Sequence, residues 1–371
     1  MSKKPLAVVI AAVALGGGAA AAGLLLTGGS EKSPDAAAHQ GMVEGTVWVA
    51  NEYGNSITAI DASTNEPVTT LTGIEGPHNI QAASDGGSVW AVSGHGSLAV
   101  MIDAATYRVH GTVHTGEMPA HVVITPDGRL AYTTNGGENT VTAVDVASMK
   151  PIATIPVGAY PHGLRPSPDG KWIYVADAKG TVLSVIDTAT NEKVADVEVG
   201  QGPVQVAFSP DGAFVYATLN GEDAVAKVDV ASRTLVGKVE VGVGPIQVYV
   251  SPDGEYLLAA NQGTEDNPST TVSIVDTATF SVVGTVETGT GAHGVVIDPS
   301  SRHAYVTNIY GDDVAVLDLA ERAVVARIPV GDGPNGISFS PLAPASAPAR
   351  KMALMMDGGG MSEDMPGMGS G

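Results

Sequence analysis

The chain has 371 residues, no cysteine, and a net charge of −21 that arises from 39 acidic and 18 basic residues. The absence of cysteine excludes disulfides, thiolate metal ligands and a thiol nucleophile. The acidity would repel a phosphate backbone, so we expect no nucleic-acid partner. Histidine, carboxylate and methionine side chains remain as candidate metal ligands.

The N-terminus has the pattern of an export signal. Lys3 and Lys4 precede an apolar run from Leu6 to Leu26, and a polar stretch follows. Such a pattern predicts a signal peptide or an uncleaved signal anchor over residues 1–30.

Both fates of this segment stay open. The run is long enough to span a bilayer as one transmembrane helix, yet the small residues 36–38 offer a cleavage site. In either case we expect an extracytoplasmic protein that is secreted, periplasmic or on the cell surface. It would contact the membrane through the N-terminal segment only if that segment is retained.

A unit of about forty residues then occurs seven times. The last copy contains the stretch Tyr305-Val306-Thr307-Asn308. Asn308 aligns with one residue in each earlier copy, at intervals of 42 and, once, 47 residues: Asn51, Ser93, Asn135, Asp177, Leu219 and Asn261. The longer interval marks an insertion from Thr264 to Pro268. A period in the low forties is typical of a four-stranded propeller blade.

We therefore predict an all-β chain that forms a seven-bladed β-propeller of four-stranded blades. The predicted organisation is a linker over 31–45, one propeller domain over 46–341, and a disordered Met/Gly-rich tail over 342–371. Within the fourth blade, the pattern predicts strands at 163–167, 172–177, 181–187 and 193–199.

The phase of the repeat makes a further prediction about the ends of the ring. The first blade begins with its second strand at Val47, so its innermost strand must come from residues 336–340. The N- and C-terminal strands would then share one blade. Closing the ring over the whole domain costs on the order of 5 kcal/mol of loop entropy, which the burial of one strand can offset.

Features that recur in every blade belong to the fold. Three residues before the repeat Asn, six of seven blades carry an aromatic residue, which predicts packing between blades: Trp48, Trp90, Tyr132, Tyr174, Tyr216, Leu258 and Tyr305. The third strand of every blade ends in Asp, which we expect to bond the next turn: Asp61, Asp103, Asp145, Asp187, Asp229, Asp276 and Asp318.

Features that differ between blades are the candidates for function. His78, His121, His162 and His293 lie at the start of the innermost strand, near the predicted mouth of the axial channel. Neutral imidazoles that converge from several blades can hold copper or zinc. The alternative is that each ring bonds a neighbouring backbone group.

The same channel and its rim supply further candidate ligand-binding residues. Arg165 stands in an innermost strand where other blades have no charge, and it would hold an anion or form an ion pair within the channel. The loops of the expected binding face carry His95, Tyr310, Asp312 and Asp313 within an acidic rim. That rim would attract cations or basic partners, or would be a solvated surface.

The tail is the other candidate metal-binding segment. Its methionines include Met355, Met356, Met361, Met365 and Met368. Thioethers are soft ligands that select Cu(I), so the tail would collect copper outside the cytoplasm. The alternative is low-complexity sequence without a ligand.

The repeat resembles the YVTN family of β-propellers, on the basis of Tyr305-Val306-Thr307-Asn308 and the recurring Pro-His-Gly, Ser-Pro-Asp-Gly and Val-Ile-Asp-Thr-Ala-Thr elements. The resemblance covers residues 46–341 and implies a WD40-like, exported binding or scaffolding protein. Related propellers form the N-terminal domain of nitrous oxide reductase, where channel-face histidines hold copper, and the d1-haem domain of cytochrome cd1.

These observations favour an exported, non-catalytic binding module that holds copper or another metal. No nucleophile motif, zinc-protease motif or phosphate loop is present, so we do not expect an enzyme. Two alternatives stay open on the same face: a lactonase-like hydrolase, and a cell-envelope scaffold. The partner is accordingly a metal ion, a small molecule or an envelope protein.

Overall fold

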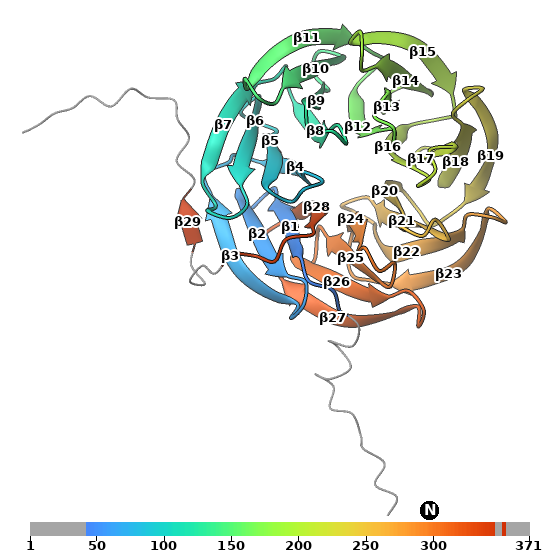
Figure 1. Ribbon diagram of the computed structural model, residues 1–371. Helices are drawn as coiled ribbons and strands as arrows, with labels where there is room; N and C mark the ends of the chain where they lie inside the picture. The colour runs from blue at the N-terminus through green and yellow to red at the C-terminus, as the bar shows by residue number, and fades with distance from the viewer. Residues whose placement is uncertain (1–41, 346–350, 354–371) are drawn as a thin grey trace, which may run out of the picture.

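The computed structural model describes residues 42–345 and 351–353, in which seven sheets surround one axis (Figure 1). No helix occurs in these ranges. Six sheets consist of four consecutive antiparallel strands, and the seventh combines strands from the two ends of the described chain. The predicted seven-bladed β-propeller is confirmed. The segments 1–30 and most of 31–45 and 346–371, for which we predicted a signal, a linker and a tail, lie outside the described residues.

Each blade consists of four strands, here termed A to D from the axis outward. The A strands are β28 (Pro334–Ser340), β4 (Pro77–Ala82), β8 (Pro119–Ile124), β12 (Pro161–Pro166), β16 (Pro203–Phe208), β20 (Pro245–Val250) and β24 (Ala292–Ile297). The B strands are β1 (Thr46–Asn51), β5 (Ser88–Ser93), β9 (Leu130–Asn135), β13 (Trp172–Asp177), β17 (Phe214–Leu219), β21 (Tyr256–Gly263) and β25 (His303–Asn308).

The outer half of each blade follows the same order. The C strands are β2 (Ser56–Asp61), β6 (Leu98–Asp103), β10 (Thr140–Asp145), β14 (Val182–Asp187), β18 (Ala224–Asp229), β22 (Pro268–Asp276) and β26 (Asp313–Asp318). The D strands are β3 (Glu66–Thr72), β7 (Val109–His114), β11 (Lys150–Pro156), β15 (Glu192–Glu198), β19 (Thr234–Glu240), β23 (Ser281–Glu287) and β27 (Ala323–Pro329). In the fourth blade, the four strands agree with the predicted ranges to within two residues.

The two ends of the ring meet in one blade, as the repeat phase predicts. β28 pairs antiparallel with β1, so that Thr46 lies opposite Ser340 and Val49 opposite Ile337. One feature goes beyond the prediction: Lys351–Ala353, within the segment expected to lack structure, forms the short strand β29, parallel to β3 at the outer edge of this blade.

The hydrophobic core lies between neighbouring blades. The predicted aromatic column is fully buried, and Trp48 of the first blade packs edge-on against Tyr107 of the second with ring centroids 5.8 Å apart. Burying each such ring contributes roughly 1.5–3 kcal/mol. These side chains therefore hold the ring together, as expected, and none lines a ligand site.

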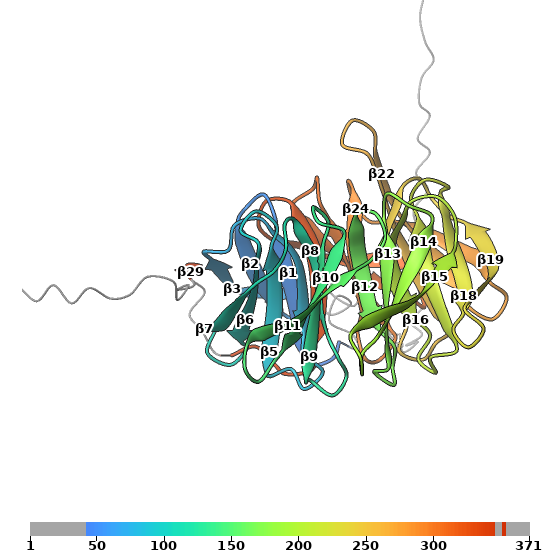
Figure 2. The same cartoon turned by 90° about the horizontal axis from the view of Figure 1, so that it is seen from above.

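The connections divide into two faces. The loop face carries the D-to-A and B-to-C connections, which bond each other: Gly94 N donates to Gly76 O, and Gly136 N donates to Met118 O. The turn face carries the A-to-B turns, where Gly170 adopts a φ of 72° in the Ser-Pro-Asp-Gly sequence. The insertion Thr264 to Pro268 lengthens the β21–β22 hairpin, which projects from the loop face (Figure 2).

The repeated aspartates and asparagines have structural roles. Every Asp at the end of a C strand accepts a backbone N–H from the following turn, as Asp61 does from Ser63 and Asp229 does from Ser232. The repeat Asn is buried at the end of strand B, where Asn51 Nδ2 donates to the hydroxyls of two residues on the next strand. These recurring residues therefore stabilise the fold rather than form a binding site.

Candidate functional site in the axial channel

Three of the four predicted histidines meet at the loop-face end of the axial channel. His78 and His162 occupy the second position of β4 and β12, and His121 occupies the third position of β8. The pairing between strands A and B is irregular across these positions in all three blades. Such a bulge re-aims side chains, so a second-position residue and a third-position residue can face the same point.

The three imidazoles lie close together. The candidate ligand nitrogens of His78, His121 and His162 lie within 4.8 Å of one another. The ring centroids are 5.6 Å apart for His78 and His121, 5.2 Å for His78 and His162, and 4.8 Å for His121 and His162. The chain therefore brings together three nitrogen donors from three consecutive blades.

Backbone carbonyls orient two of these rings. His78 Nδ1 lies 3.0 Å from Ala120 O, and His162 Nδ1 lies 3.2 Å from Val204 O, each one blade onward. A carbonyl only accepts, so Nδ1 carries the proton and Nε2 carries the free lone pair. Metal-ligating histidines commonly have this arrangement, because the second bond fixes both the tautomer and the ring orientation.

His121 is held differently. Val206 N donates to Gln205 Oε1, which turns Gln205 Nε2 toward His121 Nδ1 at 3.3 Å. The other ring nitrogen, His121 Nε2, is buried and has no hydrogen-bond partner among the described residues. An unpartnered polar atom at this depth is costly unless a further group meets it.

Burial keeps the cluster uncharged. It lowers the pKa of His78 to about 4 and that of His162 to about 3, and in His162 the neighbouring His78 adds to the effect. Burial, followed by the charges of His162 and His78, holds the pKa of His121 well below its usual range. All three imidazoles are therefore neutral at physiological pH, which is the form that binds metals.

Further polar groups surround this cluster. His293 is almost fully buried in the same layer, and burial holds its pKa well below the usual value, but its nitrogens lie outside the gathered group. Asn335 Nδ2 donates to Glu52 Oε2 at 2.6 Å. Burial raises the pKa of Glu52, whereas the bond from Asn335 and the charges of His95 and His162 oppose that rise.

The structure separates Arg165 from the histidines. Arg165 lies near the far end of β12 and lines a cavity toward the turn face. Within the described ranges it forms no ion pair, so the ion pair considered from the sequence is not found there. Its guanidinium donates only to Leu164 O, at 3.0 Å.

The predicted rim residues lie apart from the three-histidine cluster, and most are engaged in the fold. His95 is exposed in the loop between β5 and β6. Asp312 accepts from Gly333 N, and Asp313 bonds both Asn308 and Arg327. The Tyr310 hydroxyl accepts from Gln262, beside the inserted hairpin. Met355, Met356, Met361, Met365 and Met368 lie outside the described residues.

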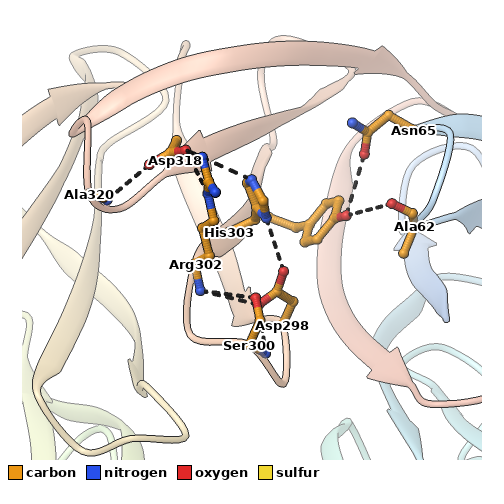
Figure 3. A network of polar contacts seen from close by, with 9 residues as sticks. Ala62, Asn65, Asp298, Ser300, Arg302, His303, Asp318 and Ala320 are labelled. Carbon is orange, nitrogen blue, oxygen red and sulfur yellow. Dashed lines mark hydrogen bonds and ion pairs between the residues drawn. The ribbon is translucent and has the colours of Figure 1, made fainter. Parts of the chain in front are cut away.

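A polar cluster around a single histidine, His303, on the turn face was not singled out from the sequence (Figure 3). His303 Nδ1 lies 3.1 Å from Asp298 Oδ2, and Arg302 bonds Asp318. Burial acts to raise the pKa of Asp298, but bonds from His303 and Ser300 outweigh it and lower the pKa. Both side chains of the pair are at most 2% exposed, so this cluster fastens the turn and offers a substrate no access.

In the described part of the chain there is no helix long and apolar enough to cross a membrane.

Comparisons with known proteins agree with this architecture. Hydrazine synthase of Kuenenia stuttgartiensis is 27% identical over 73% of this chain and 91% of its own, with a TM-score of 0.67. A putative 6-phosphogluconolactonase from Bacteroides uniformis is 19% identical over 80% of this chain and 99% of its own, with a TM-score of 0.68. The dihydro-heme d1 dehydrogenase NirN is 14% identical over 79% of this chain and 74% of its own, with a TM-score of 0.60.

The last two similarities, below 25% identity, show the fold alone. No curated protein is a significant match. The sequence matches the YNCE-like beta-propeller family over residues 96–353, which is well over half of the chain. On the strength of that match and of the seven blades, the chain belongs to the YNCE-like beta-propeller family.

Proposed function

We propose that this protein is an extracytoplasmic metal-binding propeller, and that His78, His121 and His162 together hold one copper ion. The observation that carries the proposal is the gathering of their ligand nitrogens within 4.8 Å. The proposal of export rests on the N-terminal pattern of Lys3, Lys4 and the apolar run.

The donor set suits a borderline or soft transition metal. A metal–nitrogen bond of about 2.0–2.1 Å places two ligand nitrogens about 3.3–3.5 Å apart, so the rings need to close by roughly an ångström. Rotation of partly exposed rings such as His78 and His162 supports such a closure. The lowered pKa values keep His78 and His162 neutral near neutral pH, with Nε2 free for the metal.

Copper is preferred over zinc for two reasons. It stands highest in the affinity order of divalent metals for nitrogen ligands. The C-terminal methionines, with Met355, Met356, Met361, Met365 and Met368 among them, would also supply thioethers that select Cu(I) and pass it to the channel. Zinc, which likewise takes three imidazoles, is the alternative outcome of the metal analysis.

The test is a comparison of metal content and affinity across matched variants. The full chain, a chain that ends at Ala353, and three single variants, His78→Ala, His121→Ala and His162→Ala, are purified from copper-replete cells. His114→Ala removes an exposed histidine on β7 and serves as the control. We expect one copper per chain in the full and truncated proteins and in the control.

Each channel variant should lose at least about 100-fold in affinity, because even second-shell changes cost roughly 10–100-fold. Copper that is lost on truncation but retained in the histidine variants would assign binding to the tail. Metal-free protein without measurable affinity would overturn the proposal.

A lactonase-like hydrolase is the second candidate, and Glu52 favours it. A half-buried carboxyl whose pKa is raised by burial, and whose charge interacts with that of His162, is a combination that can serve acid–base chemistry. Turnover of a lactone that Glu52→Gln abolishes while copper binding persists would support this reading. No turnover by copper-loaded or copper-free protein would exclude it for the lactones tested.

A further inference from the structure

A cavity lies toward the turn-face end of the channel, away from the histidines. Its volume is about 320 Å³, and it is lined by the fifth residues of five A strands and by adjoining turn residues. The polar side chains are those of Arg165, Gln81, Tyr249 and Ser251, and Phe208 and Val250 contribute part of an apolar wall. This volume is in the lower part of the range of small-ligand sites.

Arg165 is the central feature of the cavity. Its only hydrogen bond among the described residues is to Leu164 O, and none of the ion pairs in those ranges involves it. Arg165 is half-buried at the cavity wall, and burial lowers its pKa. Most of the N–H donors of this guanidinium therefore point into space without a protein acceptor.

The neighbouring Tyr249 does not neutralise the charge of Arg165. Burial raises the pKa of the Tyr249 hydroxyl, and the charge of Arg165 only partly opposes that rise. The phenol is thus neutral, so it does not pair with the guanidinium as an anion. A half-buried cation without a counter-charge is less favourable than a paired one, and a bound anion would relieve that cost.

We propose that this cavity binds a small organic carboxylate, with the guanidinium of Arg165 holding the carboxylate through two hydrogen bonds and the apolar wall covering the rest of the ligand. Arginine presents a planar pair of donors that matches a carboxylate. A volume of about 320 Å³ equals that of about ten water molecules, which suits a ligand of about ten non-hydrogen atoms.

The composition of the cavity favours an organic acid over inorganic phosphate. A phosphate dianion needs several donors around it, whereas this cavity offers one cation, one amide and one phenol beside an apolar wall, and the hydroxyl of Ser251 already donates to Asp253. The site is independent of the proposed copper site, because it lies on other side chains near the opposite face. Its ligand can therefore be measured on metal-free protein.

The experiment is calorimetric titration of the full chain with benzoate, 2-methylpropanoate, inorganic phosphate and the uncharged analogue benzamide. We expect at least one carboxylate to bind with one site per chain, and benzamide and phosphate to bind at least about 10-fold more weakly. Arg165→Gln should abolish carboxylate binding, and Arg165→Lys should weaken it because lysine keeps the charge but loses the fork.

Arg129→Gln is the matched control, because it removes an exposed arginine from a turn on the same face. Thermal melting of each variant distinguishes loss of the site from loss of the fold. If Arg165→Gln fails to fold, Arg165→Lys, which retains the charge, tests the site in its place. Absence of carboxylate binding at millimolar concentrations, equal binding by Arg165→Lys and wild type, or a preference for phosphate would each overturn the proposal.

Discussion

Asp177 allows a prediction for which another blade of the same chain supplies the control. It stands where four other blades have the repeat Asn, and its side chain is fully buried. Burial raises its pKa to about 7, the bond with Ser184 opposes that rise, and the nearby charge of Asp196 adds to it. Below neutral pH, the carboxyl is therefore largely protonated.

The surrounding hydrogen bonds fit a protonated carboxyl. Ser184 Oγ lies 2.8 Å from Asp177 Oδ2 and 3.0 Å from Asp196 Oδ1. One hydroxyl proton cannot serve both carboxylates, so protonated Asp177 donates to Ser184 and Ser184 donates to Asp196. In another blade, Asn261 Nδ2 makes the equivalent bond to Ser273 Oγ without any proton uptake.

The substitution Asp177→Asn should therefore stabilise the protein in a pH-dependent manner. Because the folded pKa is raised above the unfolded value, the folded state loses stability as pH rises from about 4 to about 7. At about 1.4 kcal/mol per unit, a shift of about three units sets an upper limit of about 4 kcal/mol. We expect a gain of about 1–4 kcal/mol above pH 8 and almost none near pH 4.

The assay is urea unfolding of wild type and variant at the two pH values, because the difference between them cancels the titration of all other groups. Asn261→Asp is the reciprocal control and should lose stability above neutral pH. A gain that is equal at both pH values would refute the reasoning, since it would mean that the carboxyl does not titrate with folding.

Three further outcomes are expected. The unfolding free energy should fall as pH drops from about 6.5 toward 4, because the folded pKa values of His78 and His162 are depressed and the unfolded state then binds more protons. Chemical denaturation of the His78→Gln/His162→Gln variant should show a flatter dependence of the unfolding free energy on pH. Gln205→Glu should raise copper affinity roughly 10-fold in a competition titration. The new glutamate carboxylate would accept from His121 Nδ1 and free Nε2 as a ligand, and an unchanged affinity would contradict that orientation. Deleting residues 335–341 removes most of β28 and should lower the melting temperature sharply, and an unchanged melt would contradict closure of the ring in one blade.

The sequence predicted the fold well because the repeat encodes it locally. Each Ser-Pro-Asp-Gly turn and each aspartate at the end of a C strand acts within its own blade, as Asp61 does with Ser63. Seven copies in phase then leave one arrangement in which β28 pairs with β1. Nothing in the repeat pattern indicated β29, because its three residues pair at an outer edge rather than within the repeat.

The candidate site was predicted only in part. Spacing placed four histidines on one face, but it did not determine which nitrogens converge. His121, at the third position of its strand, joins His78 and His162, whereas His293 stays outside the group although the pairing in its blade is irregular at the same place. The position of Arg165 at the opposite end follows from strand direction, since three residues along a strand span about 10 Å.

The environments of Glu52 and Asp177 lay beyond sequence reasoning for another reason. Burial sets both pKa shifts, and burial at these positions comes from the packing of neighbouring blades. A repeat alignment shows that Asp177 departs from the common Asn, which is a usable signal. It does not show which neighbours enclose the carboxyl.

The most direct test of the central claim is X-ray absorption at the copper edge of protein loaded with one equivalent of Cu(I). Binding by His78, His121 and His162 predicts about three nitrogen ligands at about 2.0 Å and no sulfur, both in the full chain and in the chain that ends at Ala353. A shell of sulfur at about 2.3 Å that disappears on truncation would place the metal on the methionines and contradict the account.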